Sequence, residues 1–66
     1  MKSLIIKYGF KKDNSYNDSI EFFRKENWGV SIFDGDYTFY RNGSTVKKIR
    51  KDENPEILED FLKQNL

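Results

Sequence analysis

The chain has 66 residues and is almost electrically neutral, with 12 Lys and Arg against 11 Asp and Glu. This length predicts one domain, residues 1–66. Its apolar run Leu4-Ile5-Ile6 is far shorter than the roughly 20 residues that cross a bilayer. With no secretory signal visible either, we expect a cytoplasmic protein with no membrane association.

Cysteine and histidine are both absent. Their absence excludes a disulfide framework and a thiolate nucleophile, and it removes the preferred ligands of zinc. General acid and base chemistry most often uses histidine. The composition therefore predicts a protein that is not an enzyme and that holds no metal and no cofactor.

The composition is rich in aromatic residues, at 17%, which argues against disorder. Phe, Tyr, Met, Ile, Asn and Lys fill 32 positions and Ala is absent, a bias that indicates an AT-rich coding sequence. We therefore expect a phage or prophage origin.

The N-terminal segment Ser3 to Phe10 alternates apolar and polar residues and predicts a strand. Residues 11–17 are polar and predict a loop.

Residues 16–28 are ambiguous. Tyr16, Ile20 and Phe23 have helical spacing, and Gly29 stands where a helix would end, so a helix is favoured. The alternative is a strand over 20–24 that forms a hairpin with 28–33.

The segments 28–34, 36–41 and 44–50 predict a three-stranded antiparallel meander. Asp34-Gly35 and Asn42-Gly43 are strong signals for type I′ hairpin turns. These turns place Val30 opposite Phe39 and Phe39 opposite Val46.

This register divides the meander into two faces. The first is apolar and predicts the core side: Trp28, Val30, Ile32, Tyr37, Phe39 and Val46. The second mixes polar and apolar side chains: Ser31, Phe33, Thr38, Tyr40, Thr45, Lys47 and Ile49.

Asn54 and Pro55 predict the start of a last helix, as N-cap and first helical residue. The predicted fold is α+β, in the order β-α-β-β-β-α, with the helices on one face of the meander. The alternative is a five-stranded meander with a C-terminal helix.

Carboxylate pairs and oxygen ligands do not form a convincing site. Asp34 and Asp36 flank a tight turn, where Asp is common for backbone reasons. Oxygen ligands also gather in one loop, at Asp13, Asn14, Asn17 and Asp18. This loop lacks the glycine and the terminal Glu of a calcium loop.

Basic residues suggest a nucleic-acid interface as an alternative function. Its candidate residues are Lys11, Lys12, Lys47, Lys48, Arg50 and Lys51, together with exposed sheet aromatics. The same lysines would also protect an edge strand from aggregation. A remote alternative is a histidine-free ribonuclease toxin using Tyr40, Arg41 and Lys47.

The second face of the meander suggests the leading function, which is non-catalytic protein binding. The candidate anchors are Phe33, Tyr40, Arg41 and Ile49, since Tyr and Arg are enriched at interface hot spots. The expected partner is a host protein modulated by a phage-type protein, or a second copy in a homodimer.

Overall fold

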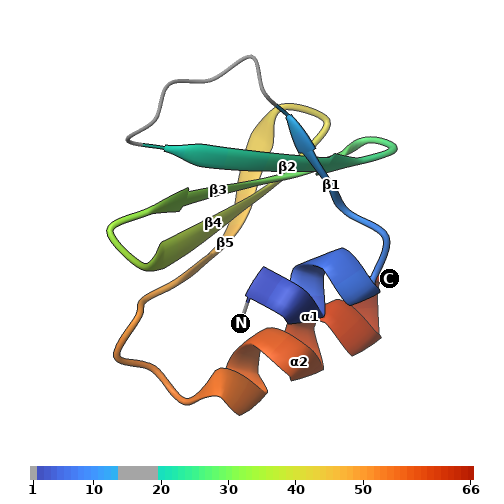
Figure 1. Cartoon of the computed structure of the whole chain (residues 1–66). Coiled ribbons are helices and arrows are strands. Elements are labelled where there is room, and N and C mark those ends of the chain that lie inside the picture. The colour runs from blue at the N-terminus through green and yellow to red at the C-terminus, as the bar shows by residue number, and fades with distance from the viewer. Residues whose placement is uncertain (1, 14–19) are drawn as a thin grey trace.

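A computed structural model describes residues 2–13 and 20–66. The chain runs through α1 (Lys2–Lys7), β1 (Lys11–Asp13), β2 (Glu21–Lys25), β3 (Trp28–Phe33), β4 (Asp36–Arg41), β5 (Ser44–Ile49) and α2 (Pro55–Asn65). The strands form one antiparallel sheet in sequential order (Figure 1). The α+β class is therefore confirmed, and the five-stranded alternative describes the sheet better than the favoured order does.

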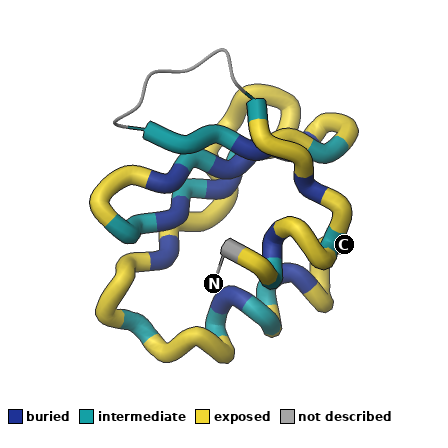
Figure 2. Tube along the Cα trace, viewed as in Figure 1, coloured by how far each residue is buried: buried dark blue, intermediate teal, exposed yellow. Residues whose placement is uncertain are grey.

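Both helices lie on the same side of the sheet, which we call the inner face (Figure 1). The hydrophobic core lies between these two layers, and buried positions of the strands and of both helices alternate with exposed ones (Figure 2). Its buried residues are Ile5, Phe10, Phe23, Trp28, Val30, Ile32, Tyr37, Phe39, Ile49, Leu58 and Leu62. On the opposite side, the outer face, none of the described residues forms a helix (Figure 1).

The two predicted hairpin turns are confirmed. Asp34 and Gly35 have φ values of 50° and 83°, and Asn42 and Gly43 have 54° and 82°. Type I′ turns need positive φ at both central residues. The resulting pairing of Val30 with Phe39 is also as predicted.

The predicted register between β4 and β5 is wrong by one residue. A bulge near Phe39 and Tyr40 pairs Phe39 with Lys47, not with Val46. Because one extra residue moves every later side chain to the opposite face, Ile49 turns into the core, where it is 1% exposed. Val46 is left 47% exposed at the sheet edge.

The predicted strand over Ser3 to Phe10 is also wrong, because this segment forms α1. The helix ends at Lys7, and Gly9, two residues beyond it, has a left-handed φ of 98°. Gly9 N–H donates to Ile6 O at 3.0 Å and Phe10 N–H donates to Ile5 O at 3.2 Å, the two bonds of a Schellman motif. This ending places both Ile5 and Phe10 in the core.

The favoured helix over 16–28 is wrong for residues 20–28, the part that the structure describes. There, β2 pairs with β3 in the hairpin that the alternative prediction gave. Glu26 begins the connecting turn with a φ of 55°. Of the polar loop predicted over 11–17, residues 11–13 form β1. The remaining residues of both predictions, 14–19, lie outside the described part of the chain.

The last helix begins as predicted. Asn54 is the N-cap, and its Oδ1 accepts a hydrogen bond from Glu56 N–H at 3.0 Å. Leu58 and Leu62 are fully buried, and the Phe61 ring lies 4.8 Å from the Phe39 ring, centroid to centroid. None of the described helices is long and apolar enough to cross a membrane.

Candidate functional site on the outer face of the sheet

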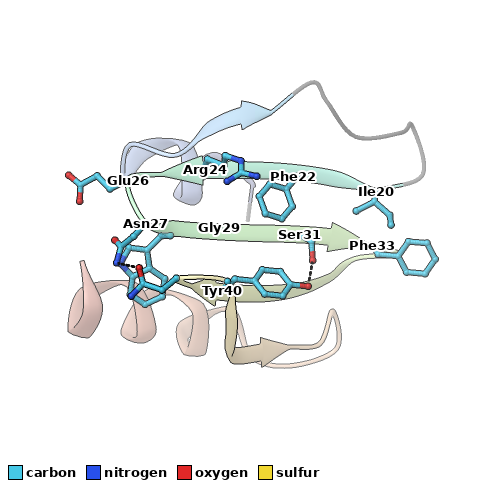
Figure 3. A pocket seen from close by; sticks show the side chains of 12 residues that line it. Ile20, Phe22, Arg24, Glu26, Asn27, Gly29, Ser31, Phe33 and Tyr40 are labelled. Carbon is cyan, nitrogen blue, oxygen red and sulfur yellow. Dashed lines mark hydrogen bonds between the residues drawn. The ribbon is translucent and has the colours of Figure 1, made fainter.

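The outer face carries an open groove with a volume of about 610 Å³. Strands β2, β3 and β4 form its floor (Figure 3). Its lining residues are Ile20, Phe22, Arg24, Glu26, Asn27, Trp28, Gly29, Ser31, Phe33, Tyr40, Asn42 and Gly43.

Two aromatic rings meet above the middle strand of this floor. Phe22 projects from β2 and Tyr40 from β4, and their ring centroids lie 6.1 Å apart with 25° between the ring planes. Gly29 of β3 makes room for this contact, because a Cβ atom there would come within 2.7 Å of Phe22 Cζ. Figure 3 shows the Tyr40 ring lying against the sheet with its face turned away from it. The two rings therefore form an aromatic surface, and their contacts with each other and with Gly29 hold it in place.

Arg24 extends this aromatic arrangement toward β1. Its guanidinium carbon lies 5.0 Å from the centroid of the Phe22 ring, a distance typical of a cation–π contact. Arg24 Nε also donates to Asp13 Oδ2 at 2.7 Å, so β1 holds the guanidinium over the ring and offsets its charge.

Polar side chains supply hydrogen-bonding groups around the rings. Ser31 Oγ and Tyr40 Oη lie 3.3 Å apart, within hydrogen-bonding distance. At the end of the groove, Asn27 Nδ2 donates to Asn42 Oδ1 at 3.2 Å, which ties two turns together. The groove thus combines an apolar floor with hydroxyl, amide and guanidinium donors.

The four predicted protein-binding residues separate in the structure. Phe33 and Tyr40 lie on the outer face, where Phe33 is 57% exposed. Arg41 points to the other side, with its guanidinium 5.4 Å from the Trp28 ring centroid. Ile49 is in the core, so its predicted place on the exposed face is wrong because of the bulge.

The six predicted nucleic-acid-binding residues also do not form one patch. Lys11 and Lys12 lie on β1, and Lys47 and Lys48 lie on β5, at opposite edges of the sheet. Four strand spacings separate these edges, about 19 Å at the usual 4.8 Å each. Arg50, just beyond β5, is exposed at the same edge as Lys47 and Lys48.

Two of these lysines have acidic partners. Lys12 Nζ lies 3.6 Å from Glu21 Oε2. Lys51 Nζ lies 3.6 Å from Asp34 Oδ2, and Lys51 N–H donates to Asp36 Oδ1 at 3.0 Å. The Asp34 and Asp36 carboxylates thus hold the turn against the segment after β5, in line with a structural role for them.

The three residues of the ribonuclease alternative do not converge. Tyr40 and Arg41 are neighbours in β4 and point to opposite faces. Lys47 pairs with Phe39, an inner-face residue, at the edge of the sheet. No cluster of three or more acidic side chains suited to a metal ion occurs within residues 2–13 and 20–66.

Most of the groove was missed by sequence reasoning. The helix predicted over 16–28, with Gly29 at its end, does not bring Phe22, Arg24 and Gly29 onto one face of a sheet. The signal that points to the groove is the alternative prediction of a strand over 20–24 that forms a hairpin with 28–33.

Comparisons of this chain with protein families, curated proteins and solved structures find no match.

Proposed function

We propose that this chain is a non-catalytic protein-binding module that docks its partner on the outer face of the sheet. The observation that carries the proposal is the arrangement of Phe22, Tyr40 and Phe33 on the face opposite to the two described helices. Aromatic side chains that enter a partner's surface dominate the energetics of many interfaces.

The side chains of this face are already held in fixed positions in the free protein, which supports the proposal. Phe22 is held by Gly29, Tyr40 and Arg24, so docking would immobilise few additional rotamers. Side chains that are already ordered reduce the entropic cost of association. The groove volume of about 610 Å³ also lies within the range of binding sites, roughly 300–1,000 Å³.

The partner in this proposal is a host protein modulated by a phage- or prophage-type protein, or a second copy of the chain. A chain without cysteine suits a reducing compartment, and we place its action in the cytoplasm.

Capture of partners from a lysate of the source cells, with light scattering alongside to count subunits, tests the proposal. The double variant Phe33→Ser with Tyr40→Ser should keep its fold and lose the partner or the dimer. Thr38→Ser, also on the outer side of β4 but outside the groove, is the matched control. A monomeric wild-type protein that captures nothing would contradict the proposal.

Nucleic-acid binding is the second candidate, and the flat rings of Phe22 and Tyr40 favour it because bases stack on such surfaces. The separation of the basic residues speaks against it, since a phosphate backbone needs a continuous run of cations. A gel shift at low salt with single- and double-stranded probes tests this candidate. A complex weakened by Lys47→Gln with Lys48→Gln would favour it over protein binding.

We propose no enzymatic activity. RNA turnover by the purified protein that disappears in Tyr40→Phe or Arg41→Ala would overturn this part of the proposal.

A further inference from the structure

We infer that the groove on the outer face binds an uncharged, proline-rich segment in the polyproline II conformation. This inference rests on the proposed function and names the class of peptide that the same site takes. It follows from three properties of the groove: its aromatic floor, its excess of hydrogen-bond donors and its balanced charge.

The floor suits proline rings. The ring of Tyr40 lies against the sheet with its face turned away from it. Beside it, Phe22 and the Arg24 guanidinium over its ring form one wall of the groove, and Phe33 adds an exposed ring at the other end of β3. Polyproline II segments dock on grooves lined by aromatic side chains, because their conformation is already formed before binding.

The donors suit the carbonyl groups of such a segment. In the pair formed by Ser31 and Tyr40, one hydroxyl donates to the other, so the second keeps its proton for a ligand. The amide of Asn42 accepts from Asn27 and has N–H groups of its own. A polyproline II backbone has no internal hydrogen bonds, and proline supplies carbonyl acceptors without N–H donors.

The charges that line the groove balance one another, which suits an uncharged ligand. Among the described lining residues, Arg24 and Glu26 are the charged ones, and Asp13 already pairs with the Arg24 guanidinium. A polyanion would gain little here, because its affinity depends on many unpaired cations.

Other peptide conformations fit the groove less well. A helix satisfies its own backbone groups, so it would leave the donors of Tyr40 and Asn42 without partners, which is costly when they are desolvated. A peptide strand needs a free sheet edge. The floor strands β2, β3 and β4 each pair with a strand on both sides.

The test is titration of the isotope-labelled protein with a capped proline decapeptide, followed by NMR and calorimetry. A capped, uncharged alanine-rich helical peptide and an oligo-dT strand are the comparison probes. We expect the proline peptide to bind and to shift amide signals of the groove residues. Tyr40→Ala should weaken this binding about tenfold or more, the effect of a hot-spot ring. Tyr40→Phe keeps the ring and should weaken it about fivefold.

Thr38→Ala is the control on the same strand and should leave the affinity unchanged. Phe33→Ala tests the face independently if Tyr40→Ala does not fold. Three outcomes would overturn the inference. The first is no binding of the proline peptide at millimolar concentration, and the second is tighter binding of either comparison probe. The third is wild-type affinity for the proline peptide in both Tyr40 variants. If lysate capture still depends on Phe33 and Tyr40 in that case, the proposed function stands and only the peptide class is wrong.

Discussion

The ring of Phe22 lies across Gly29 of the neighbouring strand, so closely that a Cβ atom at position 29 would come within 2.7 Å of Phe22 Cζ. Glycine in a strand interior lowers stability through its backbone entropy. At this position the Phe22 ring covers the glycine. Because Gly29 has no side chain, Phe22 can lie across it and contact the Tyr40 ring.

Gly29→Ala should therefore separate stability from binding. The added methyl group displaces the Phe22 ring and weakens its contact with Tyr40. Alanine also reduces the backbone entropy of the unfolded chain, which offsets part of the cost. We expect the free energy of unfolding to change by less than about 1 kcal/mol, while ring-current shifts near Tyr40 change and partner binding weakens. Thr38→Ala, on the outer side of the neighbouring strand β4 but outside the groove, is the control. Unaltered ring signals in Gly29→Ala would contradict this account of the site.

Leu62→Asp should unfold the protein. Leu62 is fully buried on α2 against the inner face, and an unpaired carboxylate there adds a desolvation cost to the loss of packing. The packing loss alone is about 2–5 kcal/mol, which is comparable to the whole stability of a chain this small. Circular dichroism during heating measures the effect. Gln64→Asp on the exposed side of the same helix is the control, and a cooperative transition at the wild-type temperature in Leu62→Asp would refute the packing.

Asn54→Ala should lower the free energy of unfolding by about 1 kcal/mol, the usual value of an N-cap side chain. The physical reason is the loss of the acceptor for Glu56 N–H, which Asn54 Oδ1 now provides at 3.0 Å. Urea denaturation of this variant against Asp52→Ala, an exposed position just upstream, measures the difference. Equal destabilisation by both substitutions would show that the cap contributes nothing specific.

Tyr37 should make the protein less stable at alkaline pH. Burial raises the pKa of Tyr37 above its ordinary value of 10.0, and the nearby Glu21 carboxylate raises it further. The unfolded chain therefore loses this proton more readily than the folded protein, so stability falls as the pH rises past about 10.

The variant Tyr37→Phe should lose this part of the pH dependence while the other groups still titrate. Urea denaturation of both proteins between neutral pH and pH values above about 10 gives the comparison. Parallel stability curves for the two proteins would rule out a contribution from Tyr37.

In the edge strand β5, a single bulged residue is enough to place the side chains that follow it on the face opposite to the predicted one. Both turns flanking β4 formed as their Asn-Gly and Asp-Gly pairs predicted, yet the bulge after the second turn exchanged the places of Val46 and Ile49. A bulge depends on how the strand fits the core and not on the turn residues, so the alternation of side chains alone could not reveal it.

Local signals in the sequence determined the elements whose formation depends on a few neighbouring residues. The turns at Asp34-Gly35 and Asn42-Gly43 require positive φ, and the cap at Asn54-Pro55 satisfies the first turn of α2 by itself. These signals were sufficient for the meander, the last helix and the α+β class.

Only the tertiary structure decided the segments whose apolar residues fit either a helix or a strand. The core requires Ile5 and Phe10 on one side, which a helix ended by Gly9 provides. It also requires Phe23 beside Val30, which β2 provides and a helix does not. The groove follows from that second choice, because Phe22 reaches Gly29 and Tyr40 only when its segment pairs with β3. Short apolar runs are stabilised mainly by the surface that they cover, and that surface exists only once the sheet has formed.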